Sequence, residues 1–158
     1  MQSLLAIYLQ DHQAAGIAGA RLARRVATAG ANRTSDLQRV ASEITEDLGA
    51  LEGIMRDLGV EPHRAKDTFA RMGERLGRLK LNGRVLRRSA LSDLLELETL
   101  RIGITGKRAR WVSLAASSNG PTDVLERLVE RAESQMRVVE DARVQAAQQA
   151  LARAEQQD

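Results

Sequence analysis

Polar side chains that could do chemistry interrupt the apolar pattern part-way along four helical segments. In chain order they are Asp11, His12, Glu43, Glu46, Asp47, Glu98 and Gln135. Buried carboxylates are costly unless they pair with a cation or bind a metal ion. If the four segments pack side by side, these residues can share one level of the fold. The pattern therefore predicts a polar layer that holds either hydrogen-bonded pairs or a metal ion.

The first segment contributes the stretch IYLQDHQAAG, in which an aspartate and a histidine are adjacent. His12 is one of two histidines in the chain. The helical spacing places His12 on the apolar stripe and Asp11 at its edge. Two interpretations of His12 follow: a hydrogen-bonded core residue, or a metal ligand beside carboxylates. Tyr8 lies one turn away and could donate a hydrogen bond to the same cluster.

Four long helices, at about 3–29, 36–58, 89–116 and 121–154, are predicted to position these residues. Hydrophobic residues make up 43% of the chain and aromatic residues 2%, so the core must consist of aliphatic side chains, which favours close-packed helices. Glycines at positions 16, 19, 103 and 106 would allow the helices to approach closely. Trp111 is expected at the bundle edge or in an interface.

Each helix is predicted to bury one stripe of side chains spaced three and four residues apart. The first stripe is Met1, Leu5, Tyr8, His12, Ala15, Gly19, Leu22, Val26 and Ala29. The second is Leu37, Ala41, Ile44, Leu48, Leu51, Met55 and Leu58. The third is Leu91, Leu94, Leu95, Glu98, Ile102, Thr105, Ala109 and Val112. The fourth is Leu125, Leu128, Ala132, Gln135, Val139, Ala142 and Ala146.

The connections between these helices predict how they pair. Short breaks after the first and third helices make each helix and its successor an antiparallel hairpin. Residues of about 61–88 form a long, partly helical crossover between the hairpins. The last turns, about 148–158, bury little and either extend past the bundle or fray. We expect one all-α domain that spans 1–158, a four-helix bundle with one long connection.

This layout resembles the ferritin-like superfamily, in which the first and third helices each give a Glu and the others each give a Glu-x-x-His. In the second helix the histidine position of that motif holds Glu46, and in the fourth helix Ala132 and Gln135 replace Glu and His. The resemblance implies a ferritin-like bundle whose di-metal motifs are degenerate. The metal ligands it leaves are Asp11, His12, Glu43, Glu46 and Glu98, which suit Fe, Mn or Zn.

A second candidate site is a run of basic residues in the crossover. Its members are Arg75, Arg78, Lys80, Arg84, Arg87 and Arg88, and no acid occurs from 76 to 92. Such a run could grip the phosphates of a nucleic acid or another polyanion. It contains no aromatic residue for base stacking, and a solvated loop is the simpler explanation. The net charge of +3 is modest beside the isoelectric point near 9.9.

Three functions are compatible with these features. The leading interpretation is a non-catalytic ferritin-like bundle without a bound cofactor, which acts structurally or through protein interactions as a homodimer. The first alternative is a metal-binding oxidoreductase or storage protein that uses the carboxylate and histidine set. The second is a nucleic-acid-associated protein that uses the basic run. The chain has no cysteine, no long apolar run and no basic leader, so we expect a cytoplasmic protein without a membrane partner.

Overall fold

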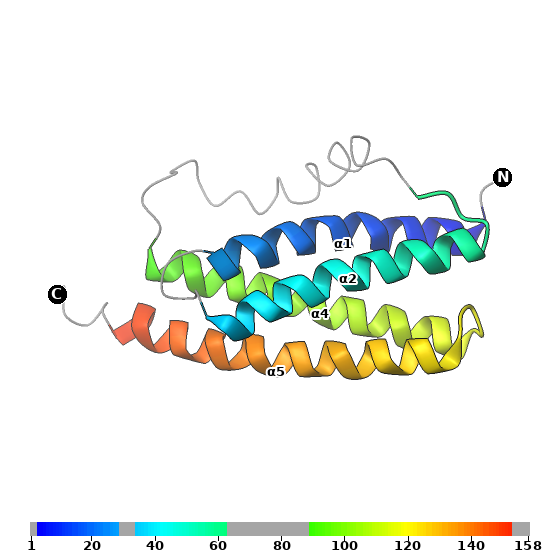
Figure 1. The fold of residues 1–158 in the computed structure, drawn as a ribbon. Helices are drawn as coiled ribbons and strands as arrows, with labels where there is room; N and C mark the ends of the chain where they lie inside the picture. The colour runs from blue at the N-terminus through cyan, green and yellow to red at the C-terminus, as the bar shows by residue number, and fades with distance from the viewer. Residues whose placement is uncertain (1–2, 29–33, 63–88, 153–158) are drawn as a thin grey trace.

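The computed structural model describes residues 3–28, 34–62 and 89–152, and these form four α-helices that pack side by side along their length (Figure 1). The helices are α1 (Leu4–Thr28), α2 (Ser35–Asp57), α4 (Ala90–Ala116) and α5 (Thr122–Ala152). The described residues contain no β-strand. The prediction of an all-α protein with four long helices is therefore confirmed. Within the described ranges, no helix is both long enough and apolar enough to cross a membrane.

Local sequence signals account for the helix ends. The hydroxyl of Thr34 accepts a hydrogen bond from the first turn of α2, and that of Ser89 does the same for α4. At the end of α2, Gly59 adopts a φ of +67°, which costs a glycine little. The Val60 N–H bonds to the Met55 carbonyl at 2.8 Å, which closes the helix in a Schellman motif.

Side-chain contacts define how neighbouring helices run. Gln13 of α1 donates to Glu52 of α2 at 3.1 Å, and Gln10, one turn earlier in α1, donates to the carbonyl of Glu61 just beyond α2 at 3.0 Å. The partner number rises as the α1 number falls, so these two helices run in opposite directions. Arg108 and Arg101 of α4 pair with α5 residues of successively higher number, Glu133 and Glu140, so α4 and α5 are also antiparallel. α1 also packs against α4, and α2 against α5.

The apolar core has two parts with polar residues between them. One part is built around Leu9, Leu51 and Trp111, and the other includes Ala20 and Leu97. Three polar side chains, Gln13, Asp47 and Lys107, occupy positions between the two parts in α1, α2 and α4. The polar layer expected from the sequence is therefore a feature of the interior, although its membership differs from the prediction.

The predicted stripes are correct for α2 and α5, correct in part for α1 and largely wrong for α4. Every described member of the α2 and α5 stripes is buried or half-buried. In α1 the predicted Val26 is buried, but most of the buried face lies one residue further along, at Leu9, Gln13, Ala20, Ala23 and Ala27, because small residues all around the helix weaken the apolar contrast. Ala15, which the stripe included, is exposed.

The α4 stripe is wrong because this helix is apolar on more than one side. Ile102, predicted to face inward, is 71% exposed, and Leu91 and Val112 are also exposed. The buried face consists of Leu94, Leu97, Leu100, Ile104, Arg110, Trp111 and Leu114. Trp111, expected at the bundle edge, is fully buried. Lys107 and Arg110 lie on this buried face. Because they are basic, the apolar spacing in the sequence did not identify it.

Candidate functional site

Asp47 is the centre of a buried ion network that joins α2, α4 and α5. Its side chain has no solvent exposure. The Oδ2 atom accepts hydrogen bonds from the Lys107 ammonium and, at 3.3 Å, from Nε2 of Gln135. The Oδ1 atom accepts one from Nη1 of Arg131 at 3.1 Å. Both carboxylate oxygens are therefore satisfied without water or a metal ion.

Gln135 extends this network to the acids at its edge. Its Oε1 accepts from the Lys107 ammonium, and its Nε2 also donates to Glu43 at 3.0 Å. Arg131 pairs with Glu46 at 3.1 Å, so it links the buried carboxylate to an exposed one. The network therefore extends from the buried Asp47 to the exposed Glu46, and each donor along it faces an acceptor. Such a layer specifies how the helices align, because any shift would break several bonds at once.

Lys107 supplies the positive charge at the centre of the network. Its side chain is 10% exposed. Burial lowers the pKa of its ammonium below the ordinary value, Asp47 opposes this shift, and the charges of Arg110 and Arg131 add to it. The Lys107 ammonium has three hydrogen-bond donors and no acceptor. Unlike a bound metal ion, it has no coordination position that a substrate could occupy. The oxygens of Asp47 and Gln135 therefore surround a cation that belongs to the chain itself.

Arg110 and Trp111 follow within one turn of α4. Arg110 is 3% exposed, and its guanidinium carbon lies 3.8 Å from the centroid of the Trp111 ring. Burial lowers the pKa of Arg110 to about 10, against the opposing effects of Asp47 and Tyr8, so the side chain stays charged at neutral pH. Among the described residues, the buried side-chain nitrogens that lack a hydrogen-bond partner are Arg110 Nε and Trp111 Nε1.

The two predicted metal ligands of α1 differ in exposure. Asp11 is exposed, and His12 is half-buried. The His12 ring meets that of Tyr8 edge to face, with centroids 4.5 Å apart and planes at 67°. Tyr8 therefore contacts His12 through its ring.

The three predicted glutamate ligands are engaged by cations or amides. Glu43 pairs with Arg39 at 3.0 Å as well as with the glutamine of the network. Glu46 is exposed at the edge of the same network. Glu98 lies 3.8 Å from Arg143, on another part of the surface. The structure thus brings Glu43 and Glu46 near the Asp47 network and leaves the other three ligands elsewhere.

The donor set therefore does not fit a di-metal centre. Within the described residues, which include all five predicted ligands, no three His, Cys, Asp or Glu side chains are grouped closely enough to hold a metal ion. The best-buried oxygens face the Lys107 ammonium instead. Metal binding by the predicted set stays a prediction.

Acidification is expected to destabilise the protein through His12. Burial, followed by the positive charge of Arg110, lowers the pKa of His12 below 6.5, while Asp11 acts in the opposite direction. Between that lowered pKa and 6.5, the unfolded chain holds a proton that the folded chain does not. The free energy of unfolding therefore falls as the pH falls through this window. Urea unfolding at about pH 7 and about pH 5 measures the decrease.

The matched control for this pH effect is His12→Gln, which keeps a polar side chain but cannot titrate. The variant should lose part of the decrease between the two pH values. An identical decrease in both proteins would show that His12 does not contribute to it.

A groove of about 950 Å³ lies between α1 and α4. Side chains of α2, Ile44 and Leu48, also line it. The basic residues His12, Lys107 and Arg110 lie at one end of the groove. The ion network and the groove therefore share Lys107.

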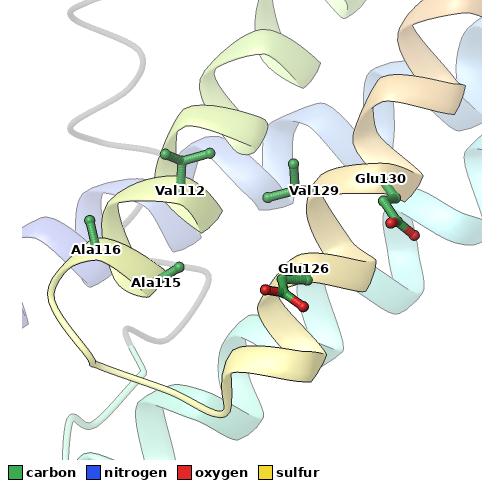
Figure 2. A pocket seen from close by; sticks show the side chains of 6 residues that line it. All are labelled: Val112, Ala115, Ala116, Glu126, Val129 and Glu130. Carbon is green, nitrogen blue, oxygen red and sulfur yellow. The ribbon is translucent and has the colours of Figure 1, made fainter.

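Figure 2 shows a second hollow, of about 470 Å³, where α4 and α5 approach their connecting turn. Its lining residues are Val112, Ala115, Ala116, Glu126, Val129 and Glu130. These side chains include two carboxylates but no nucleophile, histidine or cation. The groove between α1 and α4 is therefore the better candidate for a binding site.

The second predicted site, the basic run, lies outside the described residues. Its members are Arg75, Arg78, Lys80, Arg84, Arg87 and Arg88. The network residues that the sequence patterns did not reveal are Lys107, Arg110 and Arg131. A signal existed for the first, because Leu100, Ile104, Lys107, Trp111 and Leu114 alternate at spacings of four and three.

Comparisons with known proteins leave this chain without an assigned family: no protein-family model, curated protein or solved structure matches it. The ion network and the groove between α1 and α4 are therefore the features that bear on function.

Proposed function

We propose that this chain is a ferritin-like four-helix bundle that acts as a non-catalytic binding protein, and in which Lys107 takes the place of a metal ion. The observation that carries the proposal is the contact of the Lys107 ammonium with both Asp47 and Gln135. In the ferritin-like resemblance, Gln135 stands at a histidine ligand position. A cation that the chain itself supplies at this level meets the need of the buried carboxylate for a positive charge.

The arrangement of the helices supports the ferritin-like part of the proposal. Antiparallel contacts join α1 to α2 and α4 to α5, and 32 residues, from 58 to 89, separate the two pairs. That order agrees with two hairpins and one long connection.

The chemistry of the layer supports a non-catalytic role. An ammonium ion that is held by two acceptors offers no open coordination position and no change of oxidation state. The layer instead aligns three helices, and the groove beside it provides room for a ligand. Homodimer formation stays a prediction that light scattering at increasing concentration can test.

Metal analysis tests this function directly. The protein is purified without chelator from medium supplemented with Fe, Mn and Zn, and its metal content is measured per chain. We expect substoichiometric metal, and the same low content in Asp47→Asn and in a control, Asp36→Asn, whose side chain is 68% exposed. One metal ion per chain that is lost in Asp47→Asn and kept in Asp36→Asn would overturn the proposal in favour of a metal-binding oxidoreductase or storage protein.

A further inference from the structure

The groove between α1 and α4 is apolar along its middle. Its walls there include Leu22, Leu48, Leu95, Leu100 and Ile104. At about 1.5 Å per residue, the stretch of α4 from Leu95 to Lys107 is roughly 18 Å long. A groove with these walls matches the shape of an extended alkyl chain better than that of a compact polar molecule.

Glycines keep this groove open. Gly19 of α1 and Gly106 of α4 both line it, and a Cβ atom added at either position would meet no atom within 4 Å. Gly16 differs, since a Cβ there would approach Leu48 to 3.0 Å. The space beside Gly19 and Gly106 is therefore free of side chains from the described residues. A side chain at either position would therefore extend into the groove.

One end of the groove carries an excess of positive charge. Lys107 and Arg110 are both nearly buried there, and the nearest buried acid is Asp47. The charges of Lys107 and Arg110 oppose each other, as the lowered pKa of Lys107 reflects. Asp47 also pairs with Arg131, so it does not balance both cations of the groove.

Unused hydrogen-bond donors lie at the same end. Nε of Arg110 is buried and has no partner among the described residues. The Lys107 ammonium has three donors, of which two are directed to Asp47 and Gln135. A buried donor without an acceptor is unfavourable, and an anion would satisfy it with a charge-assisted bond.

We propose that the groove binds a long-chain monocarboxylate, with its carboxylate at Arg110 and Lys107 and its alkyl chain along the leucine-lined middle. This inference rests on the proposed binding function and names its ligand class. The ligand carboxylate accepts hydrogen bonds from the donors of Arg110 and Lys107. The alkyl chain of the ligand covers apolar surface of the groove that water would otherwise cover. Neither an alcohol nor a cationic amphiphile of the same length satisfies both requirements.

Calorimetric titration of the full chain with laurate tests the inference, and dodecanol and dodecyltrimethylammonium serve as comparison probes. We expect one laurate per chain and binding of dodecanol at least about tenfold weaker, because the charge-assisted bonds are lost. Emission of Trp111, the only tryptophan, should change with laurate, since its ring stacks on Arg110. Equal affinities for laurate and dodecanol would overturn the assignment of the cationic end.

Two pairs of variants locate the site. Arg110→Leu should weaken laurate binding by about tenfold or more, while Arg108→Leu, which changes a half-buried arginine outside the groove, should not. Gly106→Leu should fill the groove and weaken binding, whereas Gly49→Leu places the same side chain on an exposed part of α2. If Arg110→Leu does not fold, the glycine pair alone decides. Equal binding by Gly106→Leu and Gly49→Leu would overturn the inference.

Other occupants of the groove give different results. If a second copy covers it, laurate fails to bind and Gly106→Leu converts a dimer to a monomer in light scattering. If residues 63–88 cover it, laurate binds only after this segment is cleaved. Either result overturns the assignment of the ligand. Neither contradicts the proposal that Lys107 takes the place of a metal ion. Metal that is held through Asp47 would overturn the proposed function itself.

Discussion

Replacing Lys107 with methionine is expected to lower the free energy of unfolding by about 3–5 kcal/mol. Methionine keeps much of the length and bulk of the side chain, so the main change is the loss of the ammonium. The carboxylate of Asp47 then stays buried with fewer partners, and the amide oxygen of Gln135 loses its donor. Breaking a buried pair on one side leaves an uncompensated charge, which costs more than the pair contributes. Urea unfolding followed by circular dichroism measures the loss.

Arg108→Met is the matched control for this substitution, because Arg108 is adjacent to Lys107 in α4 but pairs with Glu133 near the surface. Its loss should be within about 1 kcal/mol, as for exposed ion pairs in general. Equal losses in Lys107→Met and Arg108→Met would show that the buried network contributes no more to the free energy of unfolding than an ion pair near the surface.

The second large effect is expected from Trp111→Ala, at about 3–5 kcal/mol of unfolding free energy. Trp111 is fully buried and packs in the same part of the core as Leu9, Leu51 and Met55. Removing its ring leaves a cavity that neighbouring helices fill only in part. Thermal and urea unfolding give the change.

Val112→Ala provides the control for Trp111→Ala, since Val112 is the next residue of α4 and is 43% exposed. Its effect should be about 0.5 kcal/mol or less. A small loss in Trp111→Ala would place the tryptophan at the bundle edge, where the apolar stripe originally put it.

The sequence predicted the helices well because their signals are local. α2 ends next to Gly59, close to the predicted end at about 58, and the regular leucine spacing of α2 and α5 identified their buried faces. The layer was also visible in outline, since Asp47 and Gln135 were both assigned to it. These residues interrupt strong apolar stripes, which makes them recognisable without a structure.

The partners of those residues were not predictable from the apolar pattern. Lys107 and Arg110 are among the residue types most often exposed, so a rule based on hydrophobicity places them outside. α4 also has apolar residues on a second side, such as Ile102, and these drew its predicted stripe away from the core. The packing of α4 against α1 and α5 decides that Lys107 faces Asp47 across the bundle. That contact joins residues 60 positions apart.

A double-mutant cycle on Asp47 and Lys107 tests the central claim most directly. The free energy of unfolding is measured for the original protein, Asp47→Leu, Lys107→Met and the double variant. We predict a favourable coupling of about 2–3 kcal/mol, because each single variant leaves a buried charge and the double variant removes both. The same cycle on Arg108 and Glu133 should give about 0.2–1 kcal/mol. A coupling for Asp47 and Lys107 no larger than that of the exposed pair would contradict the claim that Lys107 is the built-in cation of this bundle.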